Sequence, residues 1–505
     1  MEAVNGEAAS ARTGVPGLDD VLNGGLAPGC VYLMEGHPGT GKTTIALRFL
    51  LEGAEAGEKG LYIVLSESER ELRNGAASHG WTIDPKVEIF ELAPANSLLD
   101  AEKQQSLLYS SDLELGETTR SIFAAFERAK PSRVVLDSLS EIRLLAQSSL
   151  RYRRQLLAIK HYFSGQGATV LLLDDLTSEA QDKTAHSIVH GVIQLEETAP
   201  NYGAERRRLR VSKYRGRAVR HGYHDFAIKT GGAVVFPRLI AAEHKSRFAR
   251  RQITSGVAEL DALLGGGIEQ GSSTLILGPA GAGKSTFAIQ FLAAAARREK
   301  TAMFAFDEEL GLLFDRMRPM GVDLEAMRDA GSLTIKQVDA AELSPGEFAQ
   351  LVRTAVDAAQ VKMVVIDSLN GYQQAMPEEN SLVLHMHELL QYLNRQGANT
   401  FLTVAQHGIL GDMRAPIDIT YLADTVILLR YFEGLGAVRR AVSVIKKRSG
   451  GHETTIREYS LGAAGITIGE PLTGFRGVLE GVPVLVRPEL SSGGSTPRGA
   501  RDGSP

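Results

Sequence analysis

Two glycine-rich segments, each ending in a lysine and two hydroxyl residues, have the residue types and spacing that bind phosphate. The first, GHPGTGKTT, runs from Gly36 to Thr44, and the second, GPAGAGKST, runs from Gly278 to Thr286. In such a loop the glycines allow a tight turn, and successive backbone N–H groups face an anion. A helix that begins at the lysine adds the positive end of its dipole. The sequence therefore predicts two sites for the phosphates of a nucleotide.

The side chains of the two loops have separate expected roles. Lys42 and Lys284 are expected to reach the β- and γ-phosphates of ATP. The hydroxyl groups of Thr43 and Ser285 are expected to bind Mg²⁺. The other residues expected to contact the nucleotide are Gly39, Thr40, Gly41, Thr44, Gly281, Ala282, Gly283 and Thr286. The alternative, a glycine-rich turn with a chance lysine, is disfavoured because both matches follow a strand pattern and precede a helix pattern.

Two aspartates follow apolar strand patterns and are candidates for the second metal ligand of each site. RVVLD ends at Asp137, and MVVID ends at Asp367. The carboxyl ends of parallel strands meet at the edge of the sheet where α/β proteins bind ligands. We therefore expect both carboxylates to help hold Mg²⁺. A solvated acid at the end of a buried strand is the alternative.

A carboxylate that orients the attacking water or hydroxyl group should come from the edge of a neighbouring strand. Glu67 follows one such strand pattern in the first half of the chain. Asp307 and Glu308 follow the corresponding pattern in the second half. The competing interpretation is that these acids cap the helix that follows each strand.

The motifs occur twice in the same order, which indicates two copies of one domain. TGVPGLDDVLNGGL precedes the first loop, and TSGVAELDALLGGGI precedes the second. Within each copy short apolar runs alternate with helical patterns, which favours an α/β fold with a mainly parallel sheet covered on both faces. Val189–Leu195 and Leu209–Tyr214 have no helix between them and are expected to be antiparallel strands.

The pattern divides the chain into five segments. They are a flexible N-terminus (1–12), a first domain (13–240), a linker (241–252), a second domain (253–486) and a disordered tail (487–505). The tail is assigned as disordered because its Gly, Ser and Pro residues cannot form a packed core.

Composition restricts the class of protein. The chain has 505 residues, of which 43% are hydrophobic and 23% charged, with a formal net charge of −5. These values exclude fibrous and wholly disordered proteins and argue against a surface that binds nucleic acid over its whole extent. The single cysteine, Cys30, allows no internal disulfide and no cysteine-based zinc cluster, which favours a reducing compartment. With no apolar run of spanning length and no secretory signal pattern, we expect a cytoplasmic protein without a membrane partner.

With these motifs in this order, the sequence resembles the KaiC family of circadian-clock ATPases and autokinases, within the RecA-like superfamily. The resemblance covers about Thr13 to Val486 and includes the strand ends LDSLS and IDSLN and the DEE strand edge. It implies two tandem RecA-like P-loop domains in a double-ring hexamer with ATP at the subunit interfaces. It also implies ATP hydrolysis in the first ring, serine/threonine autophosphorylation in the second, and a KaiB-like or other signalling protein as a possible partner.

The resemblance also implies roles for residues near the end of each domain. Lys-x-Arg pairs of the family lie on a hairpin that reaches the γ-phosphate held by the next subunit, where their charge stabilises the transferred group. The matching residues are Lys213, Arg215, Lys446 and Arg448. His452 matches a histidine that lies beside the nucleotide, and Thr420 matches a phosphoacceptor. A solvated basic hairpin is the alternative for the Lys-x-Arg pairs.

The chain departs from the family pattern at three points. Ser66 replaces the first of two adjacent glutamates, Asp307 is one methylene shorter than the family residue, and Tyr421 stands beside Thr420 where a threonine is usual. These departures leave two other functions open. One is an ATP-gated scaffold that binds partners without kinase activity, and the other is a RecA-like ATPase of DNA recombination or repair. The segments Leu139–Leu150 and Leu369–Leu382, which would face DNA, are not notably basic, so a nucleic-acid partner is disfavoured.

Overall fold

A computed structural model describes most of the chain. The described residues are 10–92, 107–176, 183–199, 203–306, 308–374, 379–406, 420–434, 436–479 and 484–485, without the side chains of 107–114, 374 and 379–381. They fall into two compact units. The first contains Met1–Ile240 and Ala341–Arg353, and the second contains Ala241–Ala340 and Thr354–Pro505.

The first unit is built on a nine-stranded sheet with the order β3-β2-β4-β5-β1-β6-β7-β8-β9. Strands β3 to β6 in this order are parallel, and β6 to β9 are antiparallel. The strands are β1 (Val31–Gly36), β2 (Gly60–Val64), β3 (Val87–Glu91), β4 (Arg133–Asp137), β5 (Thr169–Asp175), β6 (Gly191–Thr198), β7 (Arg206–Tyr214), β8 (His224–Lys229) and β9 (Gly232–Phe236).

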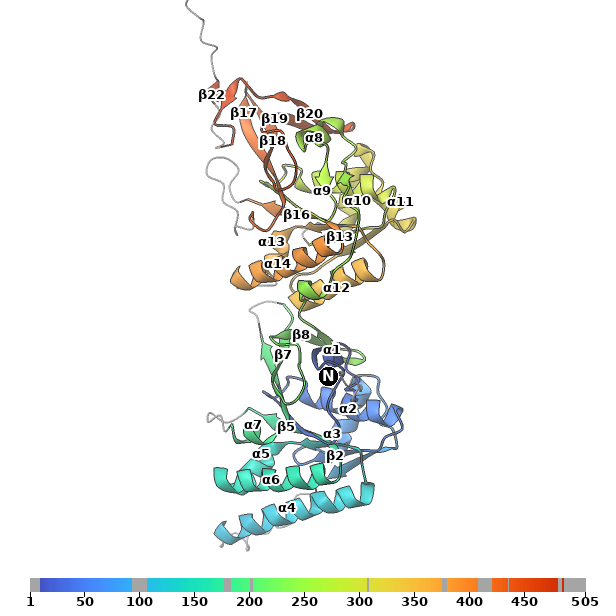
Figure 1. Cartoon of the computed structure of the whole chain (residues 1–505), viewed down its shortest axis with the longest axis vertical. Helices are drawn as coiled ribbons and strands as arrows, with labels where there is room; N and C mark the ends of the chain where they lie inside the picture. Colours follow the sequence, from blue (N-terminus) through green and yellow to red (C-terminus); the bar gives the residue numbers. More distant parts are fainter. Residues whose placement is uncertain are drawn as a thin grey trace, which may run out of the picture. The chain divides into compact units, whose positions relative to one another are not determined.

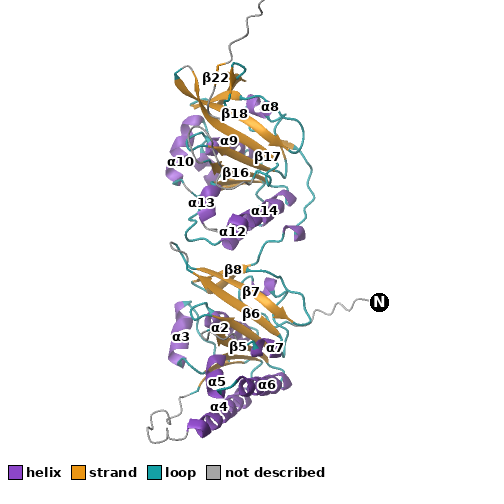
Figure 2. Ribbon diagram, turned by 90° about the vertical axis from the view of Figure 1, so that its left-hand side faces the viewer, coloured by secondary structure: helices purple, strands orange, loops and turns teal. Residues whose placement is uncertain are grey.

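Helices cover both faces of this sheet, as Figure 2 shows in purple against orange strands. One apolar core lies between the sheet and α2 and α3, and a second lies between the sheet and α4 to α7. This arrangement explains why β1, β2 and β4 are buried along their whole length. The helices are α1 (Leu18–Val21), α2 (Lys42–Glu55), α3 (Glu69–Ser78), α4 (Leu107–Ala129), α5 (Leu139–Ala146), α6 (Ser149–Gly165) and α7 (Thr184–Ile188).

The second unit repeats this topology, with the strand order β14-β13-β15-β16-β12-β17-β18-β19-β20. These strands are β12 (Ser273–Gly278), β13 (Thr301–Ala305), β14 (Leu333–Gln337), β15 (Met363–Asp367), β16 (Asn399–Ala405), β17 (Thr425–Gly434), β18 (Ala437–Lys447), β19 (Arg457–Gly462) and β20 (Gly465–Pro471). The short strands β10 (Gln252–Ile253) and β11 (Ile268–Glu269) form one small pair, and β21 (Phe475–Arg476) and β22 (Val484–Leu485) form another. Figure 1 labels the principal elements of both units.

The remaining helices follow in the second half of the chain. They are α8 (Ala258–Leu263), α9 (Lys284–Ala296), α10 (Leu310–Met317), α11 (Leu324–Asp329), α12 (Pro345–Asp357), α13 (Leu369–Gln374) and α14 (Glu379–Arg395), with 3₁₀ turns η3 (Ala241–Glu243) and η4 (Arg318–Met320). The two tandem domains with mainly parallel sheets confirm the predicted fold class. The antiparallel pairing of β6 with β7 is also as predicted.

A pair of matching hydrogen-bond patterns shows the duplication at the level of single atoms. The backbone N–H and hydroxyl of Thr13 both donate to Asp19 Oδ1, at 2.9 and 2.8 Å. Ser255 makes the same two bonds to Asp261 Oδ1, at 2.7 and 2.8 Å. In each domain the aspartate therefore holds the first residues of the domain against the short helix that follows them. This contact gives a physical reason for the repeated opening motif.

The structure differs from the sequence expectation at several element boundaries. Ala11, in the segment expected to be flexible, is buried and exchanges two backbone hydrogen bonds with Leu26. The segment expected to be a linker contains η3 and the start of β10. Most of the segment Leu139–Leu150, considered above as one that would face DNA, is occupied by α5 and the start of α6. The tail expected to be disordered, 487–505, lies outside the described residues.

Arg133 connects the buried edge of β4 to the P-loop helix of the first unit. Its guanidinium, 3% exposed, donates to Glu58 Oε2 at 2.6 Å and to the Phe49 carbonyl at 2.8 Å. It also lies 4.8 Å from the centre of the Phe49 ring, within range of a cation–π contact. Because the guanidinium is shielded from water, its hydrogen bonds to Glu58 and to the Phe49 carbonyl contribute to the stability of this unit, although Glu58 itself is 37% exposed.

We expect Arg133→Met to lower the free energy of unfolding of the first unit by about 2 kcal/mol, because hydrogen bonds from a charged group are lost while the remaining partner, Glu58, stays accessible to water. Fluorescence of Trp81, the single tryptophan of the chain, reports this unit during urea unfolding, since its ring packs on the first core. The matched control, Arg73→Met, removes an exposed pair with Glu69 and should change stability by less than about 1 kcal/mol. An equal loss of unfolding free energy in the two variants would contradict a stabilising role for the contacts of Arg133.

Candidate nucleotide site

The two glycine-rich loops have the same backbone geometry. Gly41 and Gly283 precede α2 and α9 with φ values of 95° and 94°, in the left-handed region that favours glycine. A Cβ at Gly41 would lie 2.6 Å from Ile228, and one at Gly283 would lie 2.5 Å from Leu461. As predicted, each helix begins at the lysine that follows, so its N-terminal N–H groups face the loop.

The Lys42 ammonium is held at the mouth of the first loop by three acceptors. It donates to the carbonyls of Gly36 and His37, both at 2.9 Å, and forms an ion pair with Asp175 at 2.7 Å. Its side chain is 6% exposed. An ammonium has three N–H donors, so these contacts satisfy all of them. In the second loop Lys284 donates to the Pro279 carbonyl at 2.9 Å.

The predicted metal ligands of the first domain lie together. The Thr43 hydroxyl donates to Asp137 Oδ2 at 3.3 Å, and the buried Tyr62 hydroxyl donates to the same oxygen at 2.6 Å. Burial raises the pKa of Asp137 above its usual value, and the hydrogen bond from Tyr62 opposes that rise. A hydroxyl and a carboxylate are oxygen ligands of the type that Mg²⁺ takes, so the pair fits this ion.

The other loop residues expected to contact the nucleotide are mostly buried or contact other residues of their own domain. Thr40 is fully buried and donates to the His37 carbonyl at 2.8 Å, and the Thr44 hydroxyl lies 3.2 Å from His79 Nε2. Ala282 is buried, and its carbonyl accepts a hydrogen bond from the Tyr459 hydroxyl. Thr286 is also buried.

The second domain has a cavity of about 500 Å³ against its loop. The residues that line it are Gly281, Gly283, Lys284, Ser285, Thr286, Arg316, Pro319, Met320, Leu461, Gly462 and Ala463. Met320 forms part of the apolar wall of this cavity, together with Leu461 and Pro319. Asp367 ends β15, which is separated from β12 by one strand of the sheet, and its carboxylate accepts a hydrogen bond from the Thr403 hydroxyl.

The candidate bases Glu67 and Glu308 are not the residues that cap the following helices. Ser68 and Glu71 form a capping box at α3, and Glu309 accepts a bond from Leu312 N–H at the start of α10. Partial desolvation and the charge of Asp137 raise the pKa of Glu67, whose side chain is still accessible to water.

Burial also raises the pKa of Glu308, although its ion pair with Arg316 at 2.6 Å opposes this effect. Asp307, the other predicted base, lies outside the described residues.

In the first domain the Lys-x-Arg pair contacts backbone carbonyls of α7 and its flank. Lys213 Nζ donates to the carbonyls of His186 and Val189, the latter at 2.8 Å. Arg215 donates to the Ser187 carbonyl at 3.1 Å. Both cations are therefore held by their own chain and do not touch Lys42 or Asp137.

The equivalent pair in the second domain holds the segment that contains Thr420. Lys446 Nζ donates to the carbonyls of Thr420 at 2.9 Å and of Ala423 at 2.8 Å. Arg448 donates to the Tyr421 carbonyl at 2.6 Å and to Asp424 at 3.3 Å. The predicted cationic pair and the predicted phosphoacceptor are thus in direct contact.

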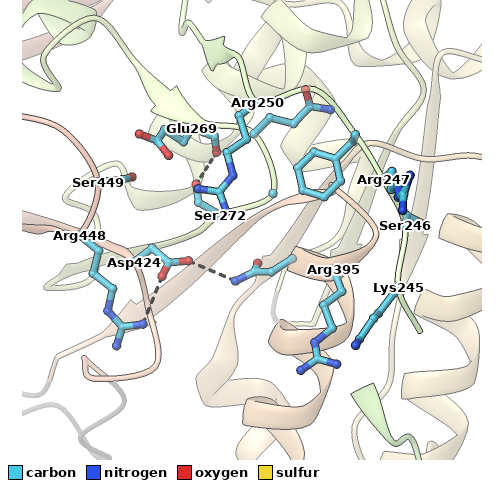
Figure 3. Close-up of a pocket in the computed structure, with 14 residues that line it drawn as sticks. Lys245, Ser246, Arg247, Arg250, Glu269, Ser272, Arg395, Asp424, Arg448 and Ser449 are labelled. Atoms are coloured by element: carbon cyan, nitrogen blue, oxygen red, sulfur yellow. Dashed lines mark hydrogen bonds and ion pairs between the residues drawn. The ribbon is translucent and has the colours of Figure 1, made fainter. Parts of the chain in front are cut away.

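Asp424 is the centre of this arrangement. Its carboxylate accepts bonds from Ser273 N–H at 3.0 Å, from the Ser273 hydroxyl at 3.1 Å and from Asn394 at 3.2 Å, besides that from Arg448. Figure 3 shows Arg448 directed at Asp424 on the wall of a cavity of about 760 Å³. His452 lies four residues beyond Arg448 and does not line the cavity at the second P-loop.

Sequence reasoning missed three polar residues that the structure brings into the sites. They are Asp175, Tyr62 and Thr403, which contact Lys42, Asp137 and Asp367 respectively. The run LLLDD that ends at Asp175 was a usable signal, because an acid at the end of an apolar strand was already the criterion for Asp137. Tyr62 and Thr403 lie within apolar strands and carry no comparable signal.

Over the described part of the chain, no three His, Cys, Asp or Glu side chains form a group that could hold a metal ion. None of the helices in the described ranges combines the length and the apolar character needed to cross a bilayer.

Comparison with known proteins identifies similar sequences over both domains. The family description "ATPase: KaiC" matches residues 11–240 and 253–473. The circadian clock protein KaiC3 of Synechocystis is 28% identical over 480 residues, which is 94% of each chain. The circadian clock oscillator protein KaiC of Prochlorococcus marinus (strain MIT 9313) is 27% identical over 93% of this chain and 95% of its own. Each of the two matched ranges contains one of the nine-stranded sheets.

We expect Asp424→Asn to loosen the segment 420–425, because hydrogen bonds to a charged group contribute about 1.5 kcal/mol or more each. Amide hydrogen exchange in a peptide that covers this segment should become about tenfold faster. The matched control is Glu458→Gln, which removes a charge paired with Arg439 on the same sheet and should leave the segment unchanged. Unchanged exchange in Asp424→Asn would show that other contacts hold the segment.

Proposed function

This chain belongs to the KaiC family of ATPases, and from that premise we propose that it binds ATP with Mg²⁺ in both domains. The first domain hydrolyses ATP, and the second transfers the γ-phosphoryl group to Thr420 of the chain itself. The function is that of a cytoplasmic signalling or circadian-type timing ATPase with serine/threonine autokinase activity. The proposed hydrolysis by the first domain is supported by one contact, in which the Thr43 hydroxyl, next to the P-loop lysine, binds Asp137 at the end of β4.

In this proposal the two loops bind the phosphates through Lys42 and Lys284. The hydroxyls of Thr43 and Ser285, with the carboxylates of Asp137 and Asp367, hold Mg²⁺, whose chemistry is to neutralise charge on the β- and γ-phosphates. The remaining contacts to the nucleotide come from the backbone and side chains of the other loop residues, which are Gly39, Thr40, Gly41, Thr44, Gly281, Ala282, Gly283 and Thr286. Glu67 in the first domain and Asp307 and Glu308 in the second are the strand-edge carboxylates included as candidate bases.

The Lys-x-Arg pairs are proposed to act on the ATP of a neighbouring subunit. Lys213, Arg215, Lys446 and Arg448 are each held by carbonyl oxygens of their own chain, with none of these contacts reaching the loop of the same domain. A cation placed away from its own nucleotide can serve an adjacent one, as arginine fingers do. We therefore include a homohexamer with ATP at the subunit interfaces, with His452 beside the nucleotide and a KaiB-like protein as a possible partner.

Phosphotransfer to Thr420 is supported by the position of its backbone against Lys446. An ammonium near the acceptor can neutralise charge on the phosphoryl group that arrives there. Tyr421 is the adjacent hydroxyl residue, and its exposed phenol is larger than a threonine side chain.

The test of autokinase activity is incubation of the full chain with Mg²⁺ and ATP labelled on its γ-phosphate. We expect label on the protein and label released as inorganic phosphate. Thr420→Ala should abolish the protein label while phosphate release continues. Tyr421→Phe is the matched control, because it removes the neighbouring hydroxyl and should keep the label. Released phosphate without labelled protein would refute the autokinase and favour an ATP-gated scaffold, whereas loss of label in Tyr421→Phe alone would transfer the acceptor role to the tyrosine.

The proposed metal site predicts an effect of Tyr62 on Mg²⁺. Tyr62→Phe removes a donor that holds down the pKa of Asp137, so this carboxyl becomes a poorer ligand at neutral pH and poorer still as the pH falls. The Mg²⁺ concentration for half-maximal nucleotide binding at the first site should rise about tenfold, as expected for loss of a group that supports a ligand. A fluorescent ATP analogue titrated with Mg²⁺ measures this change.

The matched change in the second domain is Thr403→Val, which removes the donor to Asp367. It should shift the second binding phase and leave the first unchanged. If Tyr62→Phe shifted neither phase, Asp137 would not be a metal ligand in the first domain.

A further inference from the structure

Asp175 lies at the centre of the first site because of the order of the strands. It is the last residue of β5, which pairs with β1 on one side and with β4 on the other. β1 leads into the phosphate loop, and β4 ends at Asp137. In the register of the sheet Asp175 is directly opposite Gly36, the first residue of the loop motif. Its carboxylate is therefore placed between the phosphate loop and the metal-ligand candidate.

The contact with Lys42 fixes this carboxylate on the phosphate side of the strand. Asp175 Oδ1 lies 2.7 Å from Lys42 Nζ, and the aspartate is 28% exposed, so it remains open to a ligand or to water. The neighbouring Asp174 has a different environment, since it is buried and paired with Arg143. Of the two consecutive acids, Asp175 is the one at the nucleotide position.

The second domain has no counterpart to this carboxylate. The register that pairs Gly36 with Asp175 in the first sheet pairs Gly278 with Ala405 in the second. Two residues beyond the end of β2 the first domain has Ser66, whereas the second domain has Asp307 at the same distance from the end of β13. The first domain therefore lacks an acid at one strand end where the second has one, and has an acid, Asp175, at a strand end where the second has none.

We propose that Asp175 is a catalytic residue of the first domain, where its carboxylate orients the water that attacks the γ-phosphate and accepts the proton of that water. The inference rests on the proposed hydrolysis of ATP by this domain. It assigns to Asp175 the part that Glu67, on the exposed edge beyond β2, was expected to take.

Electrostatics gives the reason for a water at this position. When Lys42 binds the phosphates of ATP, its ammonium is shared between the γ-phosphate and the carboxylate with which it now pairs. Two anions in direct contact repel each other strongly in a partly buried site, so a neutral hydrogen-bond donor must separate them. Water is such a donor, since it can give one hydrogen bond to Asp175 while its oxygen faces the phosphorus.

A cation is the other species that could lie between two anions. The described residues include no group of three acidic or histidine side chains around a common point, so Asp137, Glu67 and Asp175 do not converge on one metal ion. Mg²⁺ is accounted for by Thr43 and Asp137. Asp175 pairs with Lys42, whereas Thr43 pairs with Asp137, so we place Asp175 on the Lys42 side of the phosphates.

The reaction balances with these groups alone. The oxygen of water forms a bond to the γ-phosphorus while the bond from that phosphorus to the β–γ bridging oxygen breaks. The bridging oxygen leaves with the bonding electron pair as part of ADP. The proton lost by the water passes to the Asp175 carboxylate and then to inorganic phosphate or solvent, which restores the carboxylate.

The test compares Asp175→Asn, Asp175→Glu and Glu67→Gln in the full chain carrying Lys284→Ala, which removes the phosphate-binding lysine of the second site. Steady-state release of phosphate gives kcat, and titration with Mg²⁺ and a non-hydrolysable ATP analogue gives Kd. We expect Asp175→Asn to lower kcat by about 10²–10⁴-fold, the usual contribution of a positioned base. Its Kd for the ATP analogue should stay the same or fall, because Lys42 no longer has to weaken an ion pair with Asp175 in order to bind the phosphates. Asp175→Glu should recover part of kcat, and Glu67→Gln should lose less than Asp175→Asn.

Other outcomes overturn the proposal in distinguishable ways. An unchanged kcat in Asp175→Asn would show that Asp175 is only a counter-ion of Lys42. A parallel loss of binding and kcat, or of the urea midpoint followed by Trp81 fluorescence, would make its role structural. Recovery of kcat at high Mg²⁺ would make it a metal ligand. A parent chain without phosphate release would refute hydrolysis by the first domain itself.

Discussion

Parallel pairing of β4, β5 and β1 is the constraint on which the first site depends. Adjacent parallel strands end at one edge of the sheet, so the residues that follow them are brought within hydrogen-bonding distance even when they are far apart in sequence. Asp137, Asp175 and the loop that begins at Gly36 come together in this way. The second sheet repeats the order with β15, β16 and β12. Helices packed on both faces of the sheet, with an apolar core on each side, keep this edge in place.

The same backbone supports different polar surroundings in the two domains. In the first domain a tyrosine from β2 donates to the strand-end aspartate, and in the second a threonine from β16 does so. The register places Met303 in the second domain where Tyr62 stands in the first, and Ala405 where Asp175 stands. These exchanges alter the charge and the hydrogen bonding around the phosphates while leaving the loop geometry intact. Two sites with one architecture can therefore differ in rate and in metal affinity.

Much of the fold could be predicted from local patterns, because each strand and helix leaves its own periodicity in the sequence. The loops, Asp137 and Asp367 were found in this way, since each motif is contiguous and has its own chemistry. Asp175 and Tyr62 were missed because their roles depend on which strands are neighbours in the sheet. Local hydrophobic patterns predict strands but do not reveal the order in which the strands pair. The run LLLDD marked Asp175 as an acid at a strand end, and a position-by-position comparison of the two copies would have shown that the second domain has Ala405 there.

The contacts of Lys446 and Arg448 with the carbonyls of 420–423 make two events thermodynamically reciprocal. Any ligand that draws these cations away leaves the carbonyl oxygens without donors, so the segment becomes easier to displace. By linkage, a chemical change that displaces the segment also makes the cations easier to draw away, and by the same free energy. The segment that contains Thr420 can therefore be released from either side, by a change at the hydroxyl side chain of Thr420 or by a ligand that binds the basic residues at the end of β18.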